Sequence, residues 1–264
     1  MPRRRNPVGD TTIGTIPVVA VVSPKGGNGK TTVSSNLAVA LSRRVDSIIV
    51  DLDVHFGDVE YALRMQPTHR LDDLVDQRTH RDPGTMLSAH PTGLDVLCAP
   101  QDPVAADRLG TEEVFAVVDQ LLLLGRPVVL DTAGGISDFS LGALDRATRV
   151  VLVCGTDVPS VQAAKKLLAT MRQLSMNLDL VDLLVNRSDS NVGLSVADVE
   201  QAVGRPAVIT IPEHSSLAAG MNSGSPVTES SPRSPIAAVF QAYADQLLDL
   251  TVGANPATNR EVVR

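Results

Sequence analysis

The sequence predicts a doubly wound α/β fold, in which helices flank both faces of a mainly parallel sheet of seven strands. Short apolar runs rich in Val, Ile and Leu alternate with longer segments of helical periodicity, and no long polar linker interrupts them. Aromatic residues make up 2% of the chain and hydrophobic residues 43%, which indicates a core of aliphatic side chains. We therefore expect a single domain over residues 17–252, with flexible tails at 1–16 and 253–264.

The expected elements follow in chain order. Apolar runs predict strands at 17–22, 47–50, 94–98, 128–130, 150–154, 181–185 and 207–211. Apolar spacings of three and four residues predict helices at 31–43, 111–124, 136–147, 158–174 and 236–250, with short helical pieces at 60–65 and 71–77. The connection 78–93 is polar and contains Pro and Gly, and the stretch 220–235 is rich in Ser, Pro and Gly, so no helix is expected in either.

The first strand leads into a glycine-rich loop, S-P-K-G-G-N-G-K-T-T, at residues 23–32. This loop is expected to end at a helix N-terminus, where free N–H groups and the helix dipole favour a phosphate. Pro24 departs from the usual G-x-x-x-x-G-K-[ST] pattern, but Lys30 can still reach the β and γ phosphates and Thr31 can offer a hydroxyl to Mg²⁺. The predicted nucleotide contacts in the loop are Gly26, Gly27, Asn28, Gly29, Lys30, Thr31 and Thr32.

Three carboxylates are expected beside this loop. Asp51 and Asp53 follow the second strand and Asp131 follows the fourth, at the sheet edge where open α/β folds bind their ligands. Isolated aspartates at strand ends are also typical of solvated turns and helix caps. Next to a phosphate loop we favour a magnesium site, supported by Thr31, Asp51 and Asp131, because Mg²⁺ prefers hard oxygen ligands. Gly134 is expected to bring a backbone N–H close to the γ phosphate.

The motif K-G-G-x-G-K-T at residues 25–31 resembles that of the deviant Walker A ATPases, the MinD/ParA-type P-loop proteins. The resemblance covers roughly residues 18–250 and implies an ATPase that forms a nucleotide-sandwich homodimer. It also implies that Lys25 touches the phosphates held by the partner subunit, that Lys30 binds phosphate and that Asp53 orients the attacking water. The adenine base would contact three residues after the later strands, namely Asn186, Pro212 and Glu213.

The segment D-L-D-V-H-F-G-D-V at residues 51–59 is similar to the D-L-D-L-Q-F-G-D-V motif of the CpaE/TadZ-type proteins of Flp/Tad pilus assembly. This resemblance implies a slow, partner-stimulated ATPase that positions a pilus or secretion assembly. Its partner would be a pilus-assembly or polar recruiting protein. His55 replaces the Gln of that motif, and its chemical role stays open.

Three alternatives remain open from the sequence. A chromosome or plasmid partition ATPase, or a septum-site ATPase, would bind DNA or a different partner; Lys165 and Lys166 are candidate DNA contacts, although they also suit a solvated helix face. A non-hydrolysing scaffold would bind nucleotide only to dimerise. N-R-S-D at residues 186–189 resembles the N-K-x-D signature of GTPases, which would make Asp189 a guanine contact and GTP the ligand.

Composition and charge limit the classes of partner and the cellular locations that we expect for this protein. A net charge of −7 argues against nucleic-acid binding through bulk positive charge. Cys98 and Cys154 lie in predicted strands and are expected to be buried free thiols in a reducing cytosol. No apolar run is long enough to cross a bilayer, and the final helix has an acidic outer face rather than the basic one of a membrane-surface helix. We expect a cytoplasmic protein that a partner recruits to the inner membrane face or the cell pole.

Overall fold

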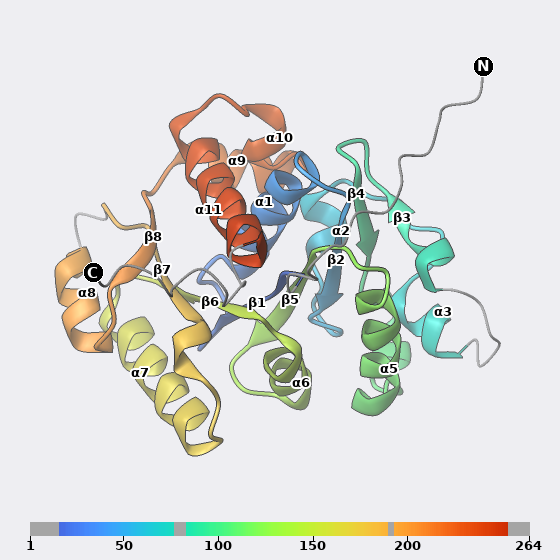
Figure 1. The fold of residues 1–264 in the computed structure, drawn as a ribbon, viewed down its shortest axis with the longest axis horizontal. Coiled ribbons are helices and arrows are strands. Elements are labelled where there is room, and N and C mark those ends of the chain that lie inside the picture. Colours follow the sequence, from blue (N-terminus) through green and yellow to red (C-terminus); the bar gives the residue numbers. More distant parts are fainter. Residues whose placement is uncertain (1–15, 77–82, 190–192, 253–264) are drawn as a thin grey trace, which may run out of the picture.

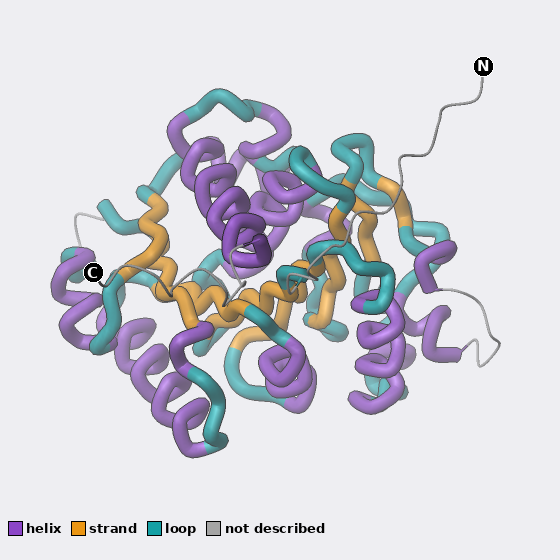
Figure 2. Tube along the Cα trace, in the orientation of Figure 1, coloured by secondary structure: helices purple, strands orange, loops and turns teal. Residues whose placement is uncertain are grey.

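Eight strands form one sheet between two layers of helices (Figure 2) in the computed structural model, which describes residues 16–76, 83–189 and 193–252. The strand order is β3-β4-β2-β5-β1-β6-β7-β8. Neighbouring strands are parallel except at one edge, where β3 pairs with β4 in the antiparallel sense. The doubly wound α/β prediction is confirmed, whereas residues 1–15 of the tail predicted at 1–16, and all of the tail predicted at 253–264, lie outside the described residues.

The elements have the following bounds. The strands are β1 Val18–Ser23, β2 Ser47–Leu52, β3 Ser88–Ala89, β4 Leu94–Leu97, β5 Val128–Gly134, β6 Arg149–Cys154, β7 Val181–Asn186 and β8 Ala207–Ile211. The α-helices are α1 Lys30–Ser42, α2 Val59–Ala62, α3 Leu71–Asp76, α4 Pro103–Ala106, α5 Thr111–Leu122, α6 Asp138–Arg146, α7 Val158–Gln173, α8 Val196–Val203, α9 Ser215–Ser223, α10 Val227–Ser230 and α11 Pro235–Val252. Two short 3-10 turns, η1 Pro83–Met86 and η2 Leu178–Leu180, complete the described elements.

All seven predicted strands are present, and β3 is an eighth that the sequence analysis missed because two residues carry no readable period. β2 and β5 also run further than expected. Their parallel pairing continues through Asp51 opposite Asp131 and through Leu52 opposite Thr132. Both aspartates therefore belong to the strands and are buried, which corrects the expectation that they follow the strand ends.

Helices α4, α8, α9 and α10 were not predicted, and the expectation of no helix in 78–93 and 220–235 was wrong, because η1 lies in the first stretch and α10 in the second. The cap of α8 had a readable signal, because the Ser195 and Asp198 side chains form a capping box. Helix α9 ends within the stretch that is rich in Ser, Pro and Gly. Its Gly220 allows the following loop to pack closely, since a Cβ there would lie 2.9 Å from the carbonyl oxygen of Ser225. The glycine at this position is therefore explained by the close packing of α9 against the loop that follows it, and not by an irregular backbone.

The sheet buries an apolar core on each face. Alternate residues of β1 show this division, because Ala20 and Val22 belong to one core and Val19 and Val21 to the other. Helices α5 to α8 cover the first face, and α1, α2, α9, α10 and α11 cover the second (Figure 1). The predicted apolar stripe of the last helix is confirmed by buried Ile236, Phe240, Tyr243 and Leu247.

The two cysteines, Cys98 and Cys154, are buried and free, as predicted, and burial raises the pKa of each thiol to about 12. Among the described residues, no helix combines the length and the apolarity that crossing a membrane requires.

Candidate nucleotide-binding site

The glycine-rich loop joins the end of β1 to the start of α1. Gly27 and Gly29 have φ angles of +80° and +91°, in the left-handed region that favours glycine. Gly29 caps α1 without a side-chain hydrogen bond, and the first turn carries no acidic residue. The N–H groups of that turn therefore remain available to an anion, and the buried Lys30 begins the helix.

Residues at the ends of two other strands, β7 and β5, hold the loop in place. The Asn186 side chain at the end of β7 donates from Nδ2 to the carbonyl oxygen of Asn28 at 2.8 Å. On the other side, a Cβ at Gly134 would lie 2.5 Å from the backbone nitrogen of Gly26, and the N–H of Gly135 donates to the carbonyl of Ser23 at 2.9 Å. Gly134 thus packs directly on the loop, and a side chain there would push the two segments apart.

Asp131 is the most deeply enclosed carboxylate of the site. Its Oδ2 accepts from the Thr31 hydroxyl at 2.8 Å, and its Oδ1 accepts from the Ser34 hydroxyl at 2.5 Å. Burial raises the pKa of Asp131 to about 6, and the two hydrogen bonds oppose that rise. Ser34 was not predicted, although it follows Thr31 by three residues and therefore lies on the same face of the helix.

Asp51 lies beside Asp131 on the neighbouring strand and is also buried. Its two oxygens accept the backbone N–H groups of Asp53 and Val59, each at 3.1 Å. Burial, and then the nearby charge of Asp131, raise the pKa of Asp51. A Cβ at Gly57 would lie 2.5 Å from Asp51 Oδ2, so the segment 53–59 folds tightly around this carboxylate.

The predicted magnesium ligands fit Mg²⁺ to different degrees. Thr31 and Asp131 bring hard oxygen donors together at the start of α1, the donor type that Mg²⁺ prefers. The raised pKa of the Asp131 carboxyl indicates that its charge lacks full compensation, which a cation would supply. Asp51 has both oxygens engaged by backbone amides, so it fits a position behind the ligands rather than a direct one.

Asp53 lies in the loop after β2 and is half-buried. It accepts the N–H of Phe56 at 3.3 Å; burial raises its pKa, and this hydrogen bond and the charge of Lys30 oppose the rise. His55 is exposed, and its Nε2 lies 3.0 Å from Oδ1 of Asp107. His55 therefore pairs with Asp107 and not with one of the three carboxylates predicted for the site.

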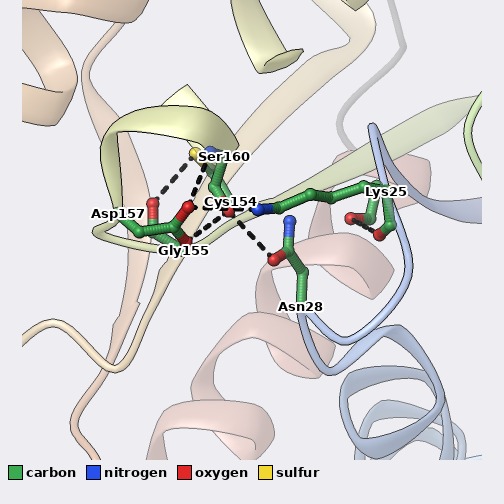
Figure 3. Close-up of polar contacts among 7 residues, drawn as sticks. Lys25, Asn28, Cys154, Gly155, Asp157 and Ser160 are labelled. Atoms are coloured by element: carbon green, nitrogen blue, oxygen red, sulfur yellow. Dashed lines mark hydrogen bonds and ion pairs between the residues drawn. The ribbon is translucent and has the colours of Figure 1, made fainter. Parts of the chain in front are cut away.

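The Lys25 side chain forms an ion pair with a residue of its own chain (Figure 3). Its Nζ lies 3.1 Å from Oδ1 of Asp157, the residue that caps α7. Asp157 also accepts from Ser160, from the backbone N–H at 2.9 Å and from the hydroxyl at 2.5 Å. Those Ser160 hydrogen bonds and the Lys25 ammonium lower the pKa of Asp157 to about 2. The Ser160 hydroxyl lies 3.1 Å from Asn28 Oδ1 and so joins this cluster to the phosphate loop.

Neither Asp157 nor Ser160 was among the predicted site residues. The D-V-P-S sequence did carry a readable helix-start signal, an Asp cap followed by Pro at the second helical position. Its contact with Lys25, 132 positions earlier in the chain, had no local signal.

A cavity of about 500 Å³ opens beside the phosphate loop. Five of the predicted nucleotide contacts line it, namely Gly29, Thr32, Asn186, Pro212 and Glu213. Residues of α9, including Leu217 and Met221, form a further wall that the sequence analysis missed. Asp189 is exposed and is not among the lining residues, and its Oδ1 accepts the N–H of Glu213 at 2.6 Å. That position does not favour a guanine-reading role for Asp189.

Comparison with known proteins agrees with this geometry. Residues 19–227 match the model of the CobQ/CobB/MinD/ParA nucleotide binding domain. An uncharacterized ATP-binding protein of Methanocaldococcus jannaschii is 26% identical over 234 residues, which cover 87% of each chain. A ParA family ATPase of Chlorobium tepidum has a similar fold, with a TM-score of 0.79 at 22% identity over 87% of this chain and 98% of that one. The septum site-determining protein MinD of Pyrococcus horikoshii, solved with Mg-ADP, gives a TM-score of 0.78 at 20% identity over 90% and 98%.

Proposed function

The chain belongs to the CobQ/CobB/MinD/ParA nucleotide-binding family, and we propose that it is an ATP-dependent dimerising switch that hydrolyses ATP to position a cellular assembly. One observation carries the proposal. The first turn of α1 presents its free amides and Lys30 at the same edge of the sheet as Thr31, Asp131 and a nucleotide-sized cavity.

Each group has a distinct part in the proposed hydrolysis. Lys30 and the loop amides bind the phosphates, and Thr31 and Asp131 would hold Mg²⁺, which would supply positive charge to stabilise the phosphates. Asp53 positions the attacking water, and its raised pKa makes it a better proton acceptor than an ordinary exposed carboxylate. The cavity that Asn186, Pro212 and Glu213 line accepts the adenine base.

A homodimer would complete the site. Large apolar side chains are exposed on two loops and at the start of α7: Phe56 is 82% exposed, Ile136 48% and Val158 56%. Such exposure favours a partner surface. In the proposed dimer Lys25 leaves Asp157 of its own chain and contacts the phosphates in the facing subunit. The present ion pair of half-exposed groups would be weak, so little free energy opposes the exchange.

Turnover of the purified chain with Mg·ATP tests the catalytic step. Lys30→Ala should abolish nucleotide binding, and Asp53→Ala should keep binding but lower the rate by at least tenfold. Wild-type protein that binds ATP tightly and releases no phosphate, with or without a partner, would instead identify the non-hydrolysing scaffold.

Dimerisation is measured separately, by light scattering on size-exclusion chromatography with ATP in the Asp53→Ala background. Lys25→Ala should retain nucleotide binding and lose the ATP-dependent dimer, while the exposed control Lys165→Ala should dimerise normally. Equal dimerisation of both variants would remove Lys25 from the interface.

For the cellular role we propose the Flp/Tad-type pilus or secretion machinery, with a pilus-assembly or polar recruiting protein as the partner. The resemblance of the D-L-D-V-H-F-G-D-V segment to the CpaE/TadZ-type motif supports this role, and within the segment Gly57 packs against Asp51 and the Val59 N–H donates to it. In this proposal the protein works in the cytoplasm, at the inner membrane face or cell pole to which the partner recruits it. Deletion of the gene should abolish surface pili, with rescue by the wild type and none by Lys30→Ala. Normal pili in the deletion strain would refute the role.

Chromosome or plasmid partition is the second candidate, favoured by one observation. Lys165, Lys166 and Arg172 are all exposed on α7 and offer cations to a DNA backbone. If this role holds, the ATP-bound protein should shift non-specific duplex DNA in a salt-dependent manner, and Lys165→Gln with Lys166→Gln should abolish the shift. No shift at low salt would exclude DNA as the partner.

A further inference from the structure

The cavity of about 500 Å³ that is proposed to accept the adenine base is called the base cavity below. A second cavity is larger, with a volume of about 740 Å³, and shares no lining residue with the base cavity. Its walls come from three segments: residues 63–69 after α2, residues 85–91 around β3, and residues 223–229 from the end of α9 into α10. The proposed ATPase cycle uses none of these residues. Its volume falls in the range that accommodates ligands larger than a simple ion.

The side chains of this cavity suit an anionic group. Arg64 and His69 line it, and neither takes part in the ion pairs formed among the described residues. Arg70, by contrast, is held by two hydrogen bonds to Glu60. Hydroxyl donors add to the lining, and Glu229 offers a carboxylate that accepts from Ser225 at 3.1 Å. Arg64 and His69 thus have no ion-pair partner among the described residues, and Glu229 is the one carboxylate among the lining residues.

The cavity rim is held in an unusual backbone conformation. Arg64 has a φ of +49° and Gly224 a φ of +65°, and the two positions face each other. A Cβ at Gly224 would lie 2.6 Å from the Arg64 Cβ and 2.8 Å from the carbonyl oxygen of Tyr61. A non-glycine residue in the left-handed region costs free energy and persists only where the surroundings fix it. The fold therefore fixes the backbone that carries Arg64 at this rim.

Two elements connect this cavity to the nucleotide site. Helix α9 borders both, since Leu217 and Met221 line the base cavity and Ser223 lines the second one. The wall at residues 63–69 follows α2, which begins directly after the loop that carries Asp53. A shift of either wall would therefore displace residues that are proposed to contact the base or to position the attacking water.

We propose that this second cavity binds a small phosphate ester and that its occupancy changes nucleotide affinity through α9. Arg64 and His69 bind the phosphate, since a guanidinium fork and an imidazole match its oxygens. Glu229 accepts a hydrogen bond from a hydroxyl or amino group of the same ligand, which excludes inorganic phosphate as the best occupant. The binding stands independently of the proposed ATPase function, whereas the effect on nucleotide affinity rests on it.

Calorimetric titration of the full chain with ribose 5-phosphate tests the binding, in saturating Mg·ADP so that the phosphate loop is occupied. We expect saturable binding that Arg64→Gln weakens by about tenfold or more, as loss of a charge-assisted hydrogen bond predicts. The matched control Arg172→Gln, at an exposed position of α7, should bind as the wild type does. Ribose without phosphate should not bind, and Glu229→Gln should weaken ribose 5-phosphate but not inorganic phosphate.

The coupling is measured by the affinity of a fluorescent ADP with and without ribose 5-phosphate. A change of at least threefold is expected in the wild type and should vanish in Arg64→Gln. Unsaturable titrations, or equal affinities in Arg64→Gln and Arg172→Gln, would overturn the proposal. The Lys30→Ala variant separates the two hypotheses, because its ribose 5-phosphate binding should persist even though nucleotide binding is lost.

Discussion

The contact between Ser34 and Asp131 gives a sharp test of how the site is held together. Both side chains are fully buried, and the Ser34 hydroxyl lies 2.5 Å from Oδ1 of the carboxylate. Ser34→Ala removes that donor and leaves a buried acceptor without it. The mutation is small, so the lost hydrogen bond dominates any packing effect.

Its magnitude follows from the charge of the acceptor. The pKa of Asp131 is about 6, so the carboxylate is mostly ionised at pH 8, where the measurement is made. Hydrogen bonds to charged groups contribute about 1.5–3 kcal/mol to the free energy of unfolding. The higher helix propensity of Ala offsets a few tenths of a kcal/mol of that loss. We expect Ser34→Ala to lower the free energy of unfolding by about 2 kcal/mol, and Tm by roughly 2–4 °C for each kcal/mol.

The neighbouring Ser35 supplies a matched control. Ser34 and Ser35 are equally buried, and each hydroxyl lies 2.7 Å from a helix carbonyl, that of Lys30 and that of Thr31 respectively. Only Ser34 also reaches a carboxylate. Urea unfolding should therefore show Ser35→Ala within about 1 kcal/mol of the wild type. If both variants lose the same stability, the Asp131 contact contributes nothing and the reasoning fails.

Three further predictions concern other parts of the site. Gly134→Ala should weaken nucleotide binding by more than tenfold in a fluorescence titration, because the new Cβ would lie 2.5 Å from the nitrogen of Gly26. Asp157→Ala should cost about 1 kcal/mol at pH 7 through loss of the α7 cap. The pKa of Asp157 in the folded protein is lowered to about 2, whereas the pKa of an unfolded Asp is about 4. The ionised Asp157 side chain therefore stabilises the fold above about pH 4, and this stabilisation is lost as the pH falls toward 2. The difference in free energy of unfolding between mutant and wild type, measured by urea unfolding, should shrink over that interval. Asp189→Ala should leave the ratio of ATP to GTP affinity unchanged, since its carboxylate binds the Glu213 amide; a change above threefold would restore the guanine hypothesis.

The fold and the phosphate loop were predictable because their signals are local. Buried parallel strands appear as aliphatic runs, and the glycines with Lys30 and Thr31 stand together in ten residues. The grouping of Asp51 with Asp131 was also predictable, because the carboxyl ends of parallel strands meet at one edge of the sheet.

The remaining parts of the site depend on tertiary contacts that leave no local pattern. The partner of Lys25 lies 132 positions away in the chain, and nothing near Lys25 indicates it. Helix α9 was missed because glycine and its polar neighbours obscure the helical period, yet it forms a wall of the base cavity. His55 stands in the motif of the Asp53 loop but bonds to Asp107, which the motif could not reveal.

The pair of buried carboxylates also shows where function opposes stability in this fold. One position earlier on the same two strands, Val50 pairs with Leu130, which is the apolar pairing that a buried sheet favours. At the next position the chain places Asp51 opposite Asp131, at a desolvation cost that burial makes large. Each carboxylate then receives two donors, from backbone amides for Asp51 and from Thr31 and Ser34 for Asp131. Those donors reduce the cost, yet burial still raises both pKa values. An apolar pair would stabilise the fold better, and the proposed magnesium-nucleotide site at this edge would account for the carboxylates that stand there instead.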